Sequence, residues 1–266
     1  MHVKASPSTR APYSILDGNI GIITMNHGKV NALSKVLLDD VVLALDTLQA
    51  VPVRVIVLRA AKGVRVFSAG HDVRELPTNG RDPLTYNDPL RLVTRKIEHS
   101  PNPVIAMVEG SVWGGACELV LSCDVIVAAD DSTFAITPAK LGVPYDIHGT
   151  LNLIKVAGMH LLKELLFTAE PVSVTRLAAS GVINHAVPRD ELEEFTVNLA
   201  RQMARTSPLV LSVMKEEIRA LANAHPLNAE SFERLQALRR DVYDSHDYQE
   251  GIRAFLEKRA PVFQGS

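Results

Sequence analysis

The chain has 266 residues, of which 47% are hydrophobic and 22% are charged. These proportions exclude a largely disordered chain and are typical of a globular protein with a substantial buried core. The formal net charge of −2, from 28 basic and 30 acidic residues, gives no reason to expect a nucleic acid or an anionic membrane as partner. A small molecule is the ligand that we expect.

The N-terminal segment, residues 1–12, is polar and lacks the apolar stretch of a signal peptide. We therefore predict a flexible tail on a cytoplasmic protein, and no later segment has the roughly 18 apolar residues that a membrane span requires. Cys117 and Cys123 have neither zinc-site nor redox-pair spacing. They are predicted to be reduced thiols in the core, and we expect no metal site.

Strands and helices are predicted to alternate from residue 13 to residue 130. A hairpin is predicted for residues 13–26, because apolar β-forming residues flank a turn signal at 17–19. Apolar residues at helical spacing then predict a helix over 34–50, with Ser34 as its N-cap. The elements predicted next are a strand at 53–59, a helix at 89–98, a strand at 103–108, a helix that ends near 122 and a strand at 124–130.

After residue 130 we expect the alternation to stop and helices to follow. Helical spacing is present over 191–206, over 209–224 and in a run from about 228 to 258. The polar segment 76–88 is predicted to be a loop that covers a site. The predicted organisation is an α/β core over residues 13–190, followed by a C-terminal helical subdomain, residues 191–266.

Two glycine turns carry the strongest chemical signal. FSAGHD at 67–72 and GSVWGGACE at 110–118 each follow an apolar run predicted to be a buried strand, and each leads into helical sequence. Glycines at 70, 114 and 115 allow positive φ and close approach of a ligand to the backbone. Backbone N–H groups at two helix starts would then form an oxyanion hole. The alternative is that both are ordinary turns of an α/β fold.

The motifs FSAGHD, VEGSVWGGACELVLSCDVIVA, FAITPAKLGV and AFLEKRAPVF resemble the crotonase superfamily of coenzyme A thioester enzymes. The resemblance covers nearly the whole chain after the N-terminal tail. It implies a crotonase-like spiral of ββα units, assembled as homotrimers that often stack as hexamers. It also implies that the N–H groups of His71 and Gly115 hold the thioester carbonyl, that coenzyme A is part of the substrate, and that no separate cofactor is used.

The same resemblance implies a path for coenzyme A, with Trp113 as a packing or pocket-wall residue. Phe255 and Lys258 would reach coenzyme A from a neighbouring subunit. The alternative for Lys29 and Lys258 is that they are solvated surface charges. The residues implied in substrate and coenzyme A binding are Lys29, Asn31, Ala32, Leu33, Ala69, Gly70, Asp72, Val73, Trp113, Gly114, Phe255 and Lys258.

Hydration of an enoyl thioester uses two carboxylates, and this chain keeps only one of them. Glu118 stands at the position of the first, whereas Pro138 takes the place of the second. The pair needed for general acid/base work is therefore missing. Glu118 is either a base or a residue that is solvated or paired with a cation such as Arg91.

The segments HGKVNALS, FSAGHDVRELP, GRDPLTYNDPLR, GSVWGGA and LGVPY resemble the superfamily members that decarboxylate methylmalonyl-CoA. Loss of CO2 from such a thioester leaves an enolate, which an oxyanion hole stabilises without metal or biotin. Tyr145 could orient the carboxylate or donate a proton, and Thr137 could hydrogen-bond the carboxylate. The alternatives are a half-buried ring for Tyr145 and a turn residue for Thr137.

Other functions stay open at this point. The same frame could serve an enoyl-CoA hydratase or isomerase, or an acyl-CoA thioester hydrolase. A non-catalytic thioester-binding protein is a further alternative. A dinucleotide-binding domain is disfavoured, because neither turn has the GxGxxG pattern with an acidic residue about 20 positions later. The identity of the malonyl-type thioester, and trimer against hexamer, are left open.

Overall fold

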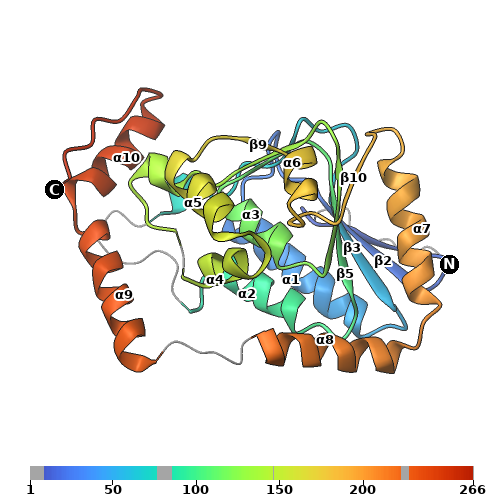
Figure 1. Cartoon of the computed structure of the whole chain (residues 1–266). Helices are drawn as coiled ribbons and strands as arrows, with labels where there is room; N and C mark the ends of the chain where they lie inside the picture. Colours follow the sequence, from blue (N-terminus) through green and yellow to red (C-terminus); the bar gives the residue numbers. More distant parts are fainter. Residues whose placement is uncertain (1–8, 77–85, 146, 223–227, 266) are drawn as a thin grey trace.

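The computed structural model describes residues 9–76, 86–145, 147–222 and 228–265 (Figure 1). Two β-sheets lie in the interior, with helices packed around them, so the predicted α/β class is confirmed. Helices α8 and α9 border the molecule, and α9 and α10 stand to one side of the sheets (Figure 1).

The chain enters the main sheet through the predicted hairpin. Strands β1 (Tyr13–Leu16) and β2 (Ile20–Met25) pair antiparallel. Asp17 and Gly18, with φ values of 53° and 78°, make the tight turn between them. Both are residue types that adopt positive φ at low cost, which explains why the turn signal was readable in the sequence.

The residues just before β1 correct the expectation of a loose tail up to residue 12. The carbonyl oxygens of Arg10 and Pro12 accept hydrogen bonds from the backbone N–H groups of Asn26 and Thr24. Ala11 is buried. Residues 10–12 therefore extend the pairing of the hairpin, and residues 1–8 lie outside the described part of the chain.

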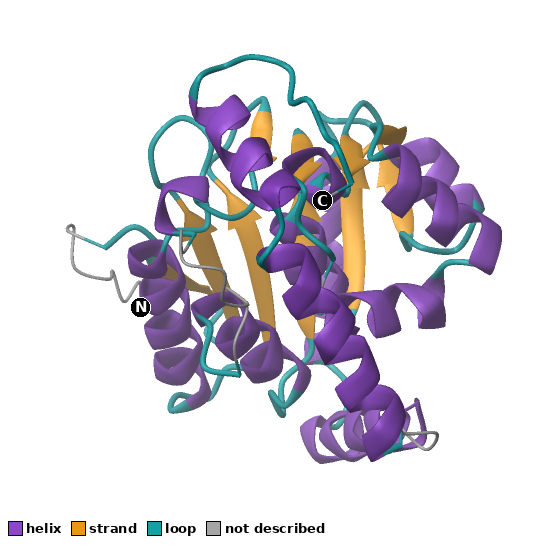
Figure 2. Ribbon diagram, turned by 90° about the vertical axis from the view of Figure 1, so that its left-hand side faces the viewer, coloured by secondary structure: helices purple, strands orange, loops and turns teal. Residues whose placement is uncertain are grey.

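The main sheet has six strands in the order β1-β2-β3-β5-β7-β10, and all its pairs after the hairpin are parallel. A second sheet has four strands in the order β4-β6-β8-β9. Figure 2 shows the strands side by side behind the helices. The bounds are β3 Val55–Ala60, β4 Val66–Ser68, β5 Val104–Val108, β6 Ser111–Trp113, β7 Val125–Ala129, β8 Thr133–Ala135, β9 Val172–Ser173 and β10 His185–Val187.

The two sheets are built by a repeated ββα unit, as the resemblance implied. Strands β3, β5 and β7 each continue into a short strand of the second sheet, β4, β6 and β8, and a helix follows. The expectation that strands end near residue 130 is wrong, because β8, β9 and β10 come later. Strands of two or three residues are too short to show an alternating pattern in the sequence.

One face of the main sheet is covered by the helices of the repeat. Helix α1 begins after Ser34, whose Oγ accepts from the N–H of Leu37 at 3.4 Å, as predicted for an N-cap. The helices in this region are α1 Lys35–Gln49, α2 Pro89–Glu98, α3 Gly115–Leu121, α4 Ile147–Val156, α5 Met159–Thr168 and α6 Val174–Ala179.

The opposite face is covered by α7 (Leu192–Ala204). Its buried residues, such as Leu192 and Ala200, pack in one cluster with Val55 and Met107 of the sheet. The predicted division at residue 190 thus separates α7 from the sheet that it covers. Whether residues 191–266 form a unit of their own stays a prediction.

Three helices complete the chain: α8 (Pro208–Ala222), α9 (Ala229–Tyr243) and α10 (His246–Leu256). The single helical run expected over 228–258 is split, because Ser245 starts a new helix by accepting from the N–H of Tyr248. Lys215 fastens α8 to the core, since its Nζ donates to the carboxylate of Asp124 at 2.7 Å.

Candidate active site

The two glycine turns meet in the structure, and Gly70 is what allows them to do so. Gly70 has a φ of 81°, and a Cβ atom on it would lie 2.4 Å from the carbonyl oxygen of Trp113 and 3.2 Å from the nitrogen of Gly115. No side chain fits in that space. The backbone after β4 therefore lies directly against the backbone after β6.

This contact brings two backbone N–H groups together. A Cβ atom on Gly115 would lie 3.8 Å from the backbone nitrogen of His71. Among the described residues, neither of these two N–H groups donates to a protein acceptor. Two unengaged donors that are this close suit an oxygen atom that gains negative charge.

The structure corrects two details of the predicted turns. The first turn leads into a three-residue 3₁₀ helix, Val73–Glu75, so only the second turn opens an α-helix. Gly115 is the first residue of α3 and does not have positive φ. A Cβ atom there would lie 2.9 Å from Cδ2 of Leu90, so any larger residue requires the Leu90 side chain to shift.

A cavity of about 760 Å3 lies beside the two turns. All of the predicted catalytic residues line it, namely His71, Gly115, Glu118, Thr137 and Tyr145. Eight of the predicted binding residues line it too, namely Ala32, Ala69, Asp72, Val73, Trp113, Gly114, Phe255 and Lys258. The cavity joins segments that are far apart in the sequence, and its size is typical of a small-molecule site.

Four predicted binding residues do not line the cavity: Lys29, Asn31, Leu33 and Gly70. Lys29 is exposed, whereas Asn31 and Leu33 are buried. The amide of Asn31 donates to the carbonyl of Phe67 at 3.0 Å, and the N–H of Leu33 donates to the carbonyl of Gly70 at 2.8 Å. These two residues join the loop before α1 to the first glycine turn.

Phe255 and Lys258 were expected to reach coenzyme A from a neighbouring subunit, and whether they also reach a neighbour's site stays a prediction. Both line the cavity of their own chain. Helix α10 reaches this position through a backbone contact, because a Cβ atom on Gly251 would lie 2.1 Å from the carbonyl oxygen of Leu141. The end of α10 and Lys258 therefore form part of the cavity wall within a single chain.

Among the described residues, two carboxylates line the cavity, and they have different surroundings. Asp72 accepts two hydrogen bonds from the Arg74 guanidinium, at 2.8 and 2.6 Å, and these bonds lower the pKa of Asp72. Glu118 is 2% exposed on α3. Pro138 lines the cavity at the position where a hydratase is expected to have its second carboxylate. Asp72 is held by its arginine, so the described part of the lining offers no pair of carboxylates poised for acid/base work.

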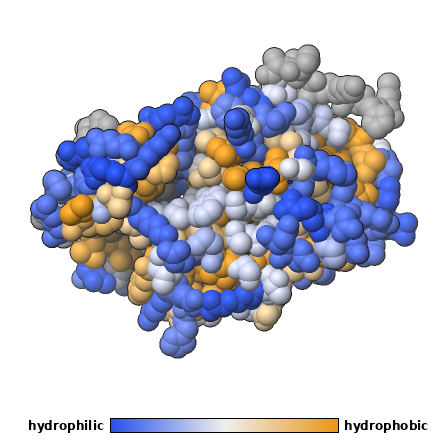
Figure 3. Space-filling view, turned by 90° about the horizontal axis from the view of Figure 1, so that it is seen from above, coloured by the Kyte–Doolittle hydropathy of each residue, from blue (hydrophilic) through white to orange (hydrophobic). Residues whose placement is uncertain are grey.

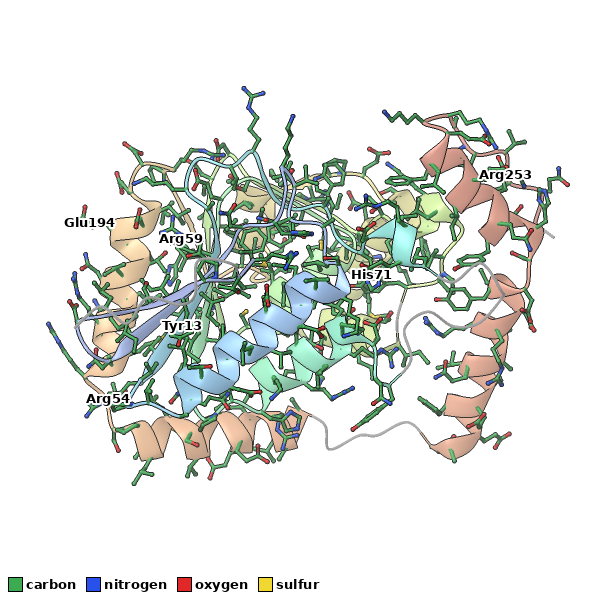
Figure 4. All side chains as sticks on the ribbon, turned by 180° about the vertical axis from the view of Figure 1, so that it is seen from behind. Tyr13, Arg54, Arg59, His71, Glu194 and Arg253 are labelled. Atoms are coloured by element: carbon green, nitrogen blue, oxygen red, sulfur yellow. The ribbon has the colours of Figure 1, made fainter. Side chains whose placement is uncertain are left out.

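The His71 side chain points toward a carboxylate that the sequence did not reveal. Its Nε2 lies 3.9 Å from Oδ2 of Asp88, and Asp88 also accepts from the N–H of Leu90 at 2.9 Å. Burial raises the pKa of Asp88, and the charges of His71 and Arg91 oppose that rise. His71 lies between the core helices and the C-terminal helices (Figure 4).

Sequence reasoning missed Leu90, a buried residue of α2 that lines the cavity above Gly115. Its only sequence signal is an apolar position at the start of the predicted helix 89–98. Most of segment 76–88, which was predicted to cover the site, lies outside the described residues.

Tyr145 lines the cavity and is held from two sides. Its ring packs on α4, where a Cβ atom on Gly149 would lie 2.9 Å from Cε1 and 3.0 Å from the hydroxyl oxygen. Its backbone carbonyl accepts a hydrogen bond of 2.6 Å from Nη1 of Arg239, on α9. The side chain and the backbone of this residue are thus fixed by different helices.

Over the described residues, no cluster of three or more His, Cys, Asp or Glu side chains is suited to hold a metal ion. None of the helices in the described ranges has the length and apolarity needed to cross a bilayer. Cys117 and Cys123 are free and buried, and burial raises the pKa of Cys117 to about 12. Neither thiol is therefore a ready nucleophile.

The ββα spiral and its paired glycine turns define a coenzyme A thioester enzyme of the crotonase fold. The chain belongs to the enoyl-CoA hydratase/isomerase family, which it matches over residues 16–266. It is 54% identical over 247 residues to methylmalonyl-CoA decarboxylase of Escherichia coli K12, with 92% of this chain and 95% of that protein covered.

Solved structures agree with this assignment. A methylmalonyl-CoA decarboxylase complexed with 2S-carboxypropyl-CoA superposes with a TM-score of 0.95 at 51% identity, covering 98% of this chain and 100% of that one. A methylmalonyl-CoA decarboxylase in complex with 2-nitronate-propionyl-CoA gives a TM-score of 0.93 at 52% identity, covering 95% and 97%.

Proposed function

We propose that this protein is a carboxy-lyase that converts methylmalonyl-CoA to propionyl-CoA and CO2. The observation that carries the proposal is the pair of unengaged N–H groups, of His71 and Gly115, beside the cavity. The bond between the α-carbon and the carboxylate breaks, and its electron pair passes to the thioester as an enolate. Both N–H groups donate to the enolate oxygen. Protonation of the α-carbon then gives propionyl-CoA.

The other residues of the cavity have supporting roles in this proposal. The Tyr145 hydroxyl orients the departing carboxylate or donates the proton, and Thr137 hydrogen-bonds the carboxylate. Because CO2 leaves without the electron pair, the reaction needs neither metal nor biotin. One oxyanion-hole donor is typically worth about 3 to 4 kcal/mol of transition-state stabilisation.

The second candidate is an enoyl-CoA hydratase or isomerase, which buried Glu118 in the lining favours. The absence of a carboxylate at Pro138 argues against hydration. The pure protein should be incubated with methylmalonyl-CoA, malonyl-CoA, crotonyl-CoA and 3-hydroxyisobutyryl-CoA, while CO2, absorbance and free thiol are followed. CO2 release from methylmalonyl-CoA is expected. Hydration, thiol release or binding without turnover would each replace the proposal.

A substitution at Gly115 tests the oxyanion hole itself. Gly115→Pro removes the donor at a position, the first residue of α3, where the proline ring is compatible with a helix. We expect kcat to fall at least about 100-fold, the usual cost of losing one donor. Gly115→Ala is the matched control, because it adds the same Cβ contact with Leu90 but keeps the N–H. Equal losses in both variants would contradict the role of the donor.

The coenzyme A part of the substrate is proposed to run from the oxyanion hole along Ala69, Asp72 and Val73 toward Phe255 and Lys258. Lys258 is exposed, as a contact with a phosphate or with adenine requires. We also propose a cytoplasmic enzyme of propionate metabolism that assembles as a homotrimer or homohexamer. Exposed apolar residues on α8 support the assembly.

A further inference from the structure

Arg239 is buried between the C-terminal helices and the cavity wall, at a site that the decarboxylation chemistry does not explain. It is 6% exposed and lies in the last two turns of α9. Removing a guanidinium from water is costly unless hydrogen bonds replace the lost hydration. The contacts that it makes therefore indicate what it is for.

Two of those contacts are with the loop that carries Tyr145. Nη1 of Arg239 donates to the carbonyl of Tyr145 at 2.6 Å and to the carbonyl of Pro144 at 3.3 Å. Both carbonyls belong to the segment between η2 (Pro138–Leu141) and α4. One charged group thus holds the two peptide groups on either side of the Tyr145 α-carbon.

The guanidinium is itself fixed by aromatic packing. Nη2 donates to the hydroxyl of Tyr243 at 3.2 Å, and Cζ lies 5.7 Å from the Tyr243 ring centre. Tyr243 packs edge-on against Tyr248 of α10, with the ring centres 5.2 Å apart. Both tyrosines share a buried cluster with Val73, which directly follows the first turn. The C-terminal helices therefore contact the oxyanion side and the Tyr145 side of the cavity at once.

We propose that Arg239 is a positioning residue for Tyr145, and that it holds the hydroxyl at the place where the substrate carboxylate departs. The inference rests on the proposed decarboxylation. A positioning role predicts a loss in kcat with a smaller change in KM, because the thioester and coenzyme A contacts are left in place. It also predicts that the effect of changing Arg239 depends on the Tyr145 hydroxyl.

A double-mutant cycle tests this dependence. Arg239→Lys keeps the charge but not the planar fork, and we expect kcat to fall about tenfold by loss of positioning. In a Tyr145→Phe background, the same substitution should lower kcat less than about twofold, since the hydroxyl to be positioned is gone. Arg240→Lys, at an exposed neighbouring site on the same helix, is the control and should leave kcat unchanged.

A second pair keeps the test decisive if Arg239→Lys does not fold. Tyr243→Phe removes only one hydroxyl that holds the guanidinium, and its smaller loss in kcat should also vanish in the Tyr145→Phe background. In whichever of the two cycles can be measured, the two substitutions act independently if the double variant shows the product of the two single losses in kcat. Such independent effects would overturn the positioning role. Failure of the wild-type protein and of Arg240→Lys to release CO2 would instead overturn the proposed function.

Discussion

At the residue scale, close backbone approach explains the glycines better than conformational freedom alone. Gly70 needs both, because its φ is 81° and a Cβ atom would meet the Trp113 carbonyl. At Gly115 a Cβ atom would meet only the end of the Leu90 side chain. The sequence predicted that both turns matter. The contact at Gly115 could not be predicted, because Leu90 belongs to α2, which precedes the second turn in the chain.

Gly149 offers a test of how Tyr145 is placed. In Gly149→Ala the new Cβ would lie 2.9 Å from the Tyr145 ring, closer than such contacts occur, so the ring must shift. Alanine favours the helix by up to about 1 kcal/mol over glycine, which offsets part of the cost of the displaced ring. We expect kcat to fall about tenfold or more, as for a misplaced catalytic group. Gly158→Ala, where a Cβ meets nothing within 4 Å, is the control. An unchanged kcat in Gly149→Ala would show that the ring position is not limiting.

At the element scale, the elements that were predicted correctly have a clear apolar pattern, such as the helical spacing of α1 and the continuous apolar run of β3. Strands β4, β6 and β8, with three residues each, left no readable pattern, although β4 and β6 lead directly into the two glycine turns. The contact between Arg239 and Tyr145 spans 94 residues. No local sequence pattern predicts such a contact, so only the folded structure shows that Arg239 binds the backbone of Tyr145.

The end of α10 provides a prediction on pH. Glu250 accepts two hydrogen bonds from Arg259 and one from the N–H of Val262, and these bonds lower its pKa from 4.5 to about 2. A lowered pKa stabilises the fold fully above the ordinary value, and the stabilisation is lost as the pH falls toward 2. We expect Glu250→Gln to lower the thermal midpoint at pH 7, and the difference from wild type to shrink between pH 4.5 and pH 2.

Glu257→Gln is the control for that measurement. Glu257 binds the same arginine, with its carboxylate 2.7 Å from Nε of Arg259, but its side chain is 53% exposed. Exposed ion pairs contribute little, typically below about 1 kcal/mol. A difference between Glu250→Gln and wild type that stays constant down to pH 2 would argue against the ionised carboxylate as its cause.

At the scale of the whole molecule, apolar residues are exposed on more than one side. The face in Figure 3, seen from above, has apolar residues among hydrophilic ones, and α8 lies at the bottom of Figure 1. Helix α8 carries a row of them at helical spacing, Leu209, Val210, Val213, Met214, Ile218 and Leu221. The opposite side of α8 is anchored to the core by Lys215. An apolar row that is exposed in the single chain is typical of a surface that another protein covers.

One substitution on α8 should therefore disrupt assembly and leave catalysis intact. The wild-type protein is expected to sediment as a trimer or hexamer, and Ile218→Arg, at a residue that is 66% exposed, to sediment as smaller species. Because α10 of the same chain completes the cavity, kcat per chain should stay within about twofold of wild type, as for a site left untouched. A wild-type monomer in sedimentation velocity would contradict the assembly.

The placement of Phe255 and Lys258 in the cavity of their own chain has a consequence for mixed assemblies. If each protomer carries a whole site, an inactive subunit does not lower the activity of its neighbours. Activity in a mixture of intact and inactive subunits is then proportional to the fraction of intact chains. A defective allele would therefore have no dominant-negative effect.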